Sequence, residues 1–435
     1  MKKAATTKSK KYFKEAITMK KSRTLLALTL AIVLCFANLI PAFAAGNPVE
    51  APDENNPVKA AIAKILQIPV GTNFPAMTFK FEVEPKSLDG DEGATAKMPP
   101  VNPKDIVFDG TETNDAVDGI ISITKESPED IFKDVEWKQA GVYIYELTET
   151  KNTYTIVDAT REYMKYSDAV YTLKVYVKEA STKGTYYIYA IAAGITAPDG
   201  DDSADVIGDK VDMTPGNSKM TFTNRYVKTN GPTDPEKPDP VTESTLLVSK
   251  AVAGPFSSST IYFGYKLTIN VPSILAAPKA FYKAYVVENG AVVTSVDNGT
   301  VAGTDAGGAY ISFVSGNEVE FNLKDGQRLV FIDTPIGTIY DVTEKAATAY
   351  TPDAYITTNG IGPVKFPGAL STELPVLGQF VGEAANKADF VNTRDEVAPM
   401  GVNLNDLPFI GMLLMALLAI AGYIVFKTRR RRAVN

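Results

Sequence analysis

The sequence of 435 residues contains no histidine and only one cysteine, Cys35. The lack of histidine removes the commonest general base, the Ser-His-Asp and Cys-His arrangements, and the commonest metal ligand. Cys35 lies in a segment that we expect to be removed, so the mature protein should carry neither a thiol nor a disulfide. These absences argue against an ordinary enzyme.

Nucleotide-binding loops and a basic surface are also missing. There is no Gly-x-x-x-x-Gly-Lys-Ser/Thr loop and no Gly-x-Gly-x-x-Gly after a strand. The chain has 44 Lys and Arg against 51 Asp and Glu, and the basic residues crowd into the two termini. We therefore expect no nucleic-acid partner, no cofactor and no metal site.

The N-terminus has the features of a secretory signal. A long basic region precedes the apolar run Leu25–Phe36, and the small-residue cleavage site Ala42-Phe43-Ala44 follows. This order predicts a signal peptide over residues 1–44. The alternative is a retained membrane helix, for which such a run is short.

The C-terminus, residues 395–435, has the features of an anchor. Residues 407–426 form an apolar stretch of 20 residues, which is long enough to cross a hydrocarbon core. The basic tail 427–432 should hold that end in the cytoplasm. We therefore expect the region between the termini to be exported and held at the cell surface, by the membrane or the cell wall.

Between the termini the sequence predicts an all-β protein. Tyrosine (21) and phenylalanine (20) are abundant, and turn residues punctuate short alternating runs. A proline-rich, charged linker at residues 229–241 divides one domain, residues 47–228, from a second, residues 242–394. Each is large enough to bury its own core, and we expect two tandem immunoglobulin-like antiparallel β-sandwiches. Examples of the predicted strands are 77–83, 171–177 and 319–323.

Three polar residue types recur in the same order in both halves of this region. Strand side chains alternate between faces, so the phase of each one can be read from its neighbours. Each of the six residues shares its strand face with apolar residues and should therefore point into a core. They are Lys64, Glu149 and Asn224 in the first half, and Lys250, Glu344 and Asn392 in the second.

Burial of these groups together suggests a covalent outcome. A buried charge is costly unless it is paired or neutralised. If the lysine amine attacks the asparagine carboxamide, ammonia leaves and a neutral Lys–Asn isopeptide bond remains. The first and last strands of each domain must then lie side by side and parallel. We expect desolvation to favour the neutral amine and the protonated carboxyl, which would hydrogen-bond the asparagine carbonyl and relay protons to the departing ammonia.

The motifs resemble the streptococcal pilin isopeptide-linkage domain family, which occurs in Gram-positive pilins and cell-wall surface proteins. The resemblance covers both domains and extends to the arrangement of signal and anchor. It implies a shaft-like or stalk-like subunit with one self-generated bond per domain. It also implies that Lys64 and Lys250 are the reactive lysines, Glu149 and Glu344 the catalytic acids, and Asn224 and Asn392 the acceptors.

Other interpretations of these residues and of the whole chain remain. Glu146 competes with Glu149, but its side chain should lie on the opposite strand face. Trp137 and the tyrosines of 186–189 could form a carbohydrate platform, although such aromatics are more often sandwich core. The same scaffold would also suit an adhesin that binds a host or matrix ligand. An exported enzyme is the third possibility, which the composition disfavours.

The sorting signal departs from the usual pattern for a sortase substrate. Leu407, Pro408 and Gly411 have the expected spacing, but isoleucine stands where the family has threonine. Pro399 and Gly401 resemble a variant motif in which methionine replaces that threonine. The candidate partners are therefore the membrane, through the C-terminal helix, and a sortase, peptidoglycan, other pilin subunits and a host ligand.

Overall fold

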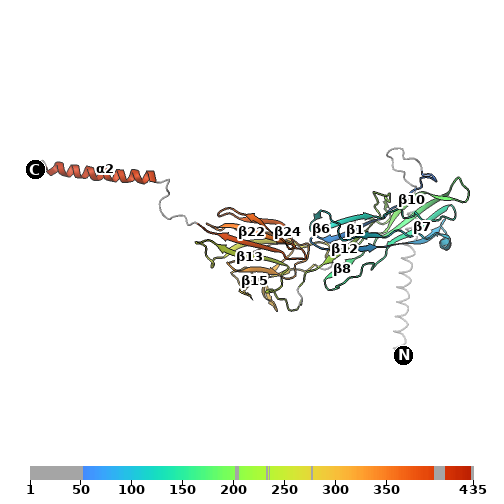
Figure 1. The fold of residues 1–435 in the computed structure, drawn as a ribbon, viewed down its shortest axis with the longest axis horizontal. Helices are drawn as coiled ribbons and strands as arrows, with labels where there is room; N and C mark the ends of the chain where they lie inside the picture. Colours follow the sequence, from blue (N-terminus) through green and yellow to red (C-terminus); the bar gives the residue numbers. More distant parts are fainter. Residues whose placement is uncertain are drawn as a thin grey trace, which may run out of the picture.

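The computed structural model describes residues 52–200, 205–231, 234, 236–275, 278–395 and 407–432. The predicted signal peptide, Pro399 and Gly401 lie outside these residues. Two elongated β domains lie end to end along the long axis of the molecule (Figure 1). The prediction of an all-β chain with two tandem sandwiches is confirmed.

The first domain consists of two five-stranded sheets and a small two-stranded one. The sheet orders are β5-β6-β1-β12-β8, β11-β10-β9-β7-β3 and β2-β4. The strands are β1 (Ala63–Pro69), β2 (Met77–Phe79), β3 (Phe81–Leu88), β4 (Ile106–Phe108), β5 (Ala116–Val117), β6 (Ile120–Glu126), β7 (Gly141–Glu149), β8 (Glu162–Lys165), β9 (Val170–Glu179), β10 (Tyr186–Ala197), β11 (Lys210–Val211) and β12 (Thr221–Lys228), with the 3₁₀ helix η1 (Glu92–Lys97) after β3.

The second domain pairs a nine-stranded sheet with a four-stranded one. The orders are β17-β18-β15-β20-β13-β25-β22-β23, with β16 beside β15, and β19-β14-β21-β24. The strands are β13 (Leu246–Ala253), β14 (Phe263–Asn270), β15 (Tyr282–Glu288), β16 (Ala291–Val292), β17 (Gly303–Asp305), β18 (Gly308–Phe313), β19 (Glu318–Leu323), β20 (Arg328–Phe331), β21 (Ile339–Glu344), β22 (Thr351–Thr358), β23 (Ile361–Pro367), β24 (Leu374–Phe380) and β25 (Lys387–Thr393).

The strands follow the alternation of apolar residues that the sequence displays. In β9 and β21 buried residues alternate with partly exposed ones, as expected for strands with one face on a core. The predicted strand 77–83 differs, because Lys80 is exposed and the run divides there into β2 and β3. These two pieces pair with different strands, β4 and β7. A change of partner, which period-two alternation does not reveal, causes this break.

The first and last strands of each domain are adjacent and parallel, as predicted. In the first domain β1 pairs with β12, and Lys64 lies opposite Phe222 while Leu66 lies opposite Asn224. In the second domain β13 pairs with β25 with the same offset, since Lys250 lies opposite Phe390. In both cases the asparagine lies two residues further along the ladder than the lysine.

Glu383 joins the two domains through both its backbone and its side chain. Its N–H donates to the Gly71 carbonyl over 3.3 Å, and its Oε1 accepts from the backbone N–H of Asn73 over 2.6 Å. Lys228 Nζ lies 3.4 Å from the same oxygen. The Asn230 side chain donates to the carbonyl of Glu383 over 2.9 Å. The domains are thus connected by more than the linker.

Helix α2 (Leu407–Arg432) contains the predicted apolar stretch. Its segment Pro408–Val425 is long and apolar enough to cross a membrane, and none of it is buried against the rest of the protein. By length and composition, the helix therefore suits the membrane anchor that the sequence predicts.

Candidate cross-linking sites

In the first domain, Lys64, Glu149 and Asn224 meet in the core between the two large sheets. Lys64 lies on β1, Asn224 on the neighbouring β12, and Glu149 ends β7 in the opposite sheet. All three are buried, with Lys64 and Asn224 at 0 % exposure. Lys64 Nζ lies 3.0 Å from Glu149 Oε1, and Asn224 Nδ2 donates to that same oxygen over 2.8 Å. One carboxylate oxygen therefore bridges the amine and the amide nitrogen.

The second domain repeats this arrangement. Lys250 on β13 donates to Glu344 Oε1 over 3.0 Å, and Asn392 Nδ2 on β25 donates to the same oxygen over 2.6 Å. Glu344 ends β21 in the opposite sheet, as Glu149 ends β7. All three residues are buried. The structure thus brings together both sets of residues that the sequence singled out.

An aromatic ring lies beside each amine. Lys64 Nζ is 4.6 Å from the centre of the Phe79 ring, and Lys250 Nζ is 4.2 Å from that of Phe263. Sequence reasoning did not identify either ring, because only the packing of the two sheets brings it over the lysine. These rings complete apolar pockets from which water is excluded.

Burial shifts the proton equilibria of both pairs in the direction that suits amide chemistry. Desolvation lowers the pKa of Lys64 and of Lys250 to about 8, although the neighbouring glutamate opposes the shift. Desolvation also raises the pKa of Glu149 and of Glu344 above the ordinary value. A larger fraction of each lysine is therefore in the neutral, nucleophilic form than for a lysine in water.

The orientation of the carboxamide differs from the expectation. We expected the glutamic acid to hydrogen-bond the asparagine carbonyl, but each glutamate contacts the amide nitrogen instead. In the first domain the carbonyl oxygen, Asn224 Oδ1, accepts from the backbone N–H of Ser167 over 2.8 Å, which fixes this orientation. Each glutamate is therefore placed to carry a proton from the amine to the leaving nitrogen, and in the first domain the carbonyl is polarised by the Ser167 N–H.

The competing residues lie elsewhere. Glu146 faces outward and pairs with Lys86 at 2.8 Å, so it is not available to the buried lysine. Trp137 is partly buried and packs edge-on against Tyr143, with ring centres 4.8 Å apart. It belongs to the margin of the core, and the structure gives no support to a carbohydrate platform at this position.

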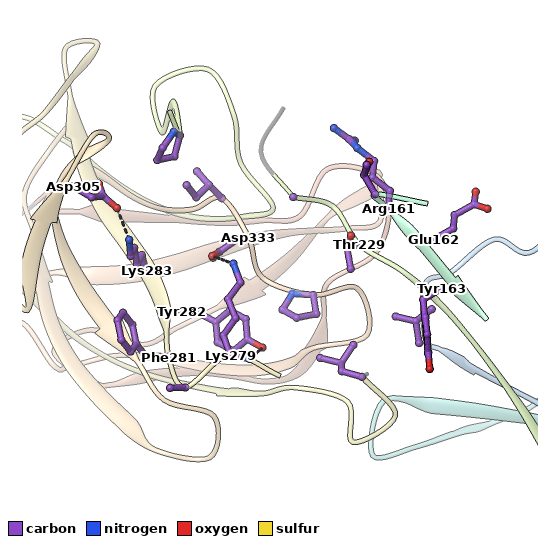
Figure 2. A pocket seen from close by; sticks show the side chains of 18 of the residues that line it. Arg161, Glu162, Tyr163, Thr229, Lys279, Phe281, Tyr282, Lys283, Asp305 and Asp333 are labelled. Atoms are coloured by element: carbon purple, nitrogen blue, oxygen red, sulfur yellow. Dashed lines mark hydrogen bonds and ion pairs between the residues drawn. The ribbon is translucent and has the colours of Figure 1, made fainter. Parts of the chain in front are cut away.

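A cavity of about 780 Å³ lies where the two domains meet. Figure 2 shows its side chains, with Lys279 directed at Asp333 and Lys283 at Asp305. In each pair the lysine Nζ lies 2.6 Å from the aspartate Oδ2. These lysines are engaged by aspartates at the cavity wall and do not form a Lys–Glu–Asn set. Other side chains lining it include Arg161, Glu162, Tyr163, Thr229, Phe281 and Tyr282.

Two expectations from the sequence remain: no metal site, and an imperfect sorting motif. Within the described residues there is no cluster of three or more acidic, cysteine or histidine side chains that could hold a metal ion. Leu407, Pro408 and Gly411 form the first turns of helix α2. Cleavage at this motif stays a prediction.

In comparisons with known proteins, each of the two domains matches a different family model. Residues 60–227 match the family model described as a Spy0128-like isopeptide containing domain. Residues 244–394 match another family model, described as a domain of unknown function (DUF7601). Among curated proteins, no relative was found.

Solved structures similar to the chain include pilus proteins of low sequence identity. The major pilin from Streptococcus pyogenes is 18% identical, with 78% of this chain and 100% of that chain covered and a TM-score of 0.30. The major pilin protein T3.2 from Streptococcus pyogenes is 19% identical, with coverage of 78% and 98% and a TM-score of 0.27. A pilus-presented adhesin is 10% identical, with coverage of 78% and 100% and a TM-score of 0.22.

Two tandem β-sandwiches, each with a buried Lys–Glu–Asn set between its first and last strands, define a class of domain equipped for internal cross-linking. The first domain, residues 60–227, matches the Spy0128-like isopeptide containing domain. Helix α2 is, by length and composition, compatible with anchoring the chain in a membrane.

Proposed function

We propose that the protein is a structural, pilin-like shaft or stalk subunit that stiffens itself with two internal isopeptide bonds, Lys64–Asn224 and Lys250–Asn392. The observation that supports this most strongly is the occurrence of the same buried constellation, with the same two-residue offset, in both domains. A single buried lysine could be a structural accident, but two matched sets are difficult to explain by packing alone.

The reaction follows from the contacts. Both members of the Lys64–Glu149 pair become uncharged once the amine proton has moved to Glu149 Oε1, 3.0 Å away. The free amine attacks Cγ of Asn224 and forms the Nζ–Cγ bond. Glu149 then passes a proton to Nδ2, to which it is hydrogen-bonded. The Cγ–Nδ2 bond breaks, ammonia leaves, Nζ gives its second proton to Glu149, and an amide replaces an amide.

Each site would react once, so this is self-processing and not enzymatic turnover. Both reactants belong to the same chain, and the product has neither a free amine nor a leaving group. The bond ties the first strand to the last, and unlike a disulfide it resists reduction. That property suits an exported protein whose only cysteine lies in the predicted signal peptide.

The decisive experiment is the intact mass of the folded ectodomain. We expect the sequence mass less two ammonia molecules, and less one ammonia in each of Asn224→Ala and Asn392→Ala after correction for the substitution. Lys210→Ala, which alters an exposed lysine, is the matched control and should keep both losses. A wild-type mass equal to the plain sequence mass would refute the proposal.

Adhesion is the second candidate, and the cavity between the domains is the observation that favours it. Cell-wall extracts distinguish the two roles. A shaft subunit should form high-mass ladders that withstand boiling in detergent, whereas an adhesin that does not polymerise gives one band. The same extracts show whether a sortase joins the chain to peptidoglycan.

A further inference from the structure

The two cross-linking sites differ at the carbonyl oxygen of the acceptor asparagine. In the first domain the Ser167 N–H donates to Asn224 Oδ1 over 2.8 Å and to Glu149 Oε2 over 3.1 Å. In the second domain the equivalent atoms, Asn392 Oδ1 and Glu344 Oε2, are buried without any hydrogen-bond partner among the described residues. The same chemistry would therefore proceed in two different electrostatic environments.

The difference lies in the strand beside the acceptor. In the second domain the ladder between β22 and β25 continues past the acceptor: Pro352, which has no backbone N–H, lies opposite Asn392, and Asp353, which corresponds in register to Ser167, stays paired with Val391. In the first domain the ladder between β8 and β12 ends at the pair Lys165–Arg225. The chain leaves the ladder there, and the Ser167 N–H is free to turn toward the buried side chains.

Lys151 and Asp199 hold the turn that presents this N–H. Lys151 Nζ donates to the Ser167 carbonyl and lies 2.5 Å from Asp168 Oδ1. Asp199 accepts from the Asp168 N–H over 3.0 Å through Oδ1, and from the Thr223 N–H over 2.6 Å through Oδ2. Asp199 thus ties the turn to β12 at the residue next to the acceptor asparagine.

We propose that the Ser167 N–H is the oxyanion donor of the first domain, that Lys151 and Asp199 are its positioning residues, and that the Lys64–Asn224 bond therefore forms faster than the Lys250–Asn392 bond. This inference rests on the proposed isopeptide function. When the amine attacks Cγ of Asn224, negative charge develops on Oδ1, where the N–H already points. As Glu149 takes up the amine proton, its Oε2 becomes a weaker acceptor, and the N–H shifts fully to the oxyanion.

The test follows both bonds in the same newly synthesised full-length chain. The chain is made by cell-free translation with detergent present, quenched at intervals and digested, and the two cross-linked peptide pairs are quantified by mass spectrometry. In the wild type the Lys64–Asn224 pair should appear first. Removing one oxyanion donor costs about 10²–10³ in rate in other acyl-transfer sites, so Ser167→Pro should slow this pair by about that factor.

Three side-chain variants test the Ser167 N–H donor without removing it. Lys151→Met should slow the first bond by about tenfold or more, because misplacement of a reacting group is costly. Lys151→Arg keeps the donor and should restore the rate, and Ser167→Ala keeps the N–H and should react almost as the wild type does. The Lys250–Asn392 pair, in the same chain, should be unaffected in every variant.

The fluorescence of Trp137, the only tryptophan of the sequence, distinguishes a structural role of these residues from a chemical one, because Trp137 lies in the first domain. Its fluorescence follows folding, so a chemical role predicts normal folding and delayed cross-linking. If Ser167→Pro does not fold, Lys151→Met and Asp199→Asn decide the matter. Folded variants with wild-type cross-linking rates, or a wild type whose second bond forms first, would overturn the inference. Absence of both bonds from the wild type would instead refute the proposed function.

Discussion

Removing either partner of the first bond should destabilise the first domain by an amount that follows from the closed loop. The bond would enclose residues 64–224, and for loops longer than about 100 residues the chain-entropy account gives about 5 kcal/mol of stabilisation. For a domain of this size, that free energy corresponds to a fall in melting temperature of about 10–20 °C. Asn224→Ala and Lys64→Met should each show this fall in melting temperature in scanning calorimetry. The transition concerned is the unfolding of the first domain, which Trp137 fluorescence also reports.

The two substitutions also remove contacts, so the single variants do not isolate the bond. Asn224→Ala also deletes the hydrogen bond from the Ser167 N–H to the carbonyl oxygen of residue 224, at a cost of about 1–3 kcal/mol. The double variant separates the terms, because a covalent bond can be lost only once. We expect Lys64→Met with Asn224→Ala to be about as unstable as either single variant.

Additive costs in this cycle would contradict the reasoning. If the double variant lost about twice as much free energy as each single one, independent side-chain contacts would explain the stability and no bond would be needed. The transition of the second domain should stay in place in all three variants, and it provides the internal reference.

Four further outcomes are expected. In Asn224→Ala, where Lys64 stays free, the free energy of unfolding of the first domain should rise between pH 8 and pH 10. The folded-state pKa of Lys64 lies below its unfolded value, so the unfolded chain binds more protons in that window, and the rise should vanish in the double variant. Glu149→Ala should abolish only the first bond by mass, while Glu146→Ala, on the solvent face, should keep both. Glu383→Ala should broaden the distribution of domain orientations in small-angle scattering, and an unchanged profile would show that the linker alone sets them. The protein should remain with the cells, extracted by detergent if it is membrane-held or released by muralytic digestion if a sortase has processed it; recovery from the medium with an intact C-terminus would contradict both.

The sequence was sufficient to find the buried Lys–Glu–Asn sets because strand periodicity is local. Lys64 shares its face with Ile62 and Leu66, and both neighbours are fully buried. The same reasoning excluded Glu146, three residues from Glu149 and therefore on the other face. The parallel pairing of first and last strands was predicted from the chemistry, since the bond could not form without it.

The parts that the sequence did not reveal depend on backbone and on long-range packing. The donor at Ser167 is a peptide N–H, which any residue except proline possesses, so no residue type marks it. The contrast with Asp353, which stays in the ladder beside Val391, appears only once the strand register is known. Glu383 was also missed, because its partners Gly71 and Asn73 lie in the other domain and no periodicity relates them.

The register also bears on how such a bond would carry load. When a chain is pulled at its ends, parallel first and last strands slide past each other, with β1 drawn toward its N-terminus and β12 toward its C-terminus. Asn224 lies two residues, or roughly 6.6 Å, ahead of the position opposite Lys64, so this sliding increases the separation of the two anchor points. A cross-link between them would become taut before the ladder shifts by a residue, and the force would pass from Lys64 to Asn224 without entering residues 65–223. The second domain has the same offset between Lys250 and Asn392. Under tension the force would therefore pass through the two isopeptide bonds and the segment that joins them. The contacts of Glu383 with Lys228 and Asn230 of that segment would then be the first non-covalent interactions to bear the force.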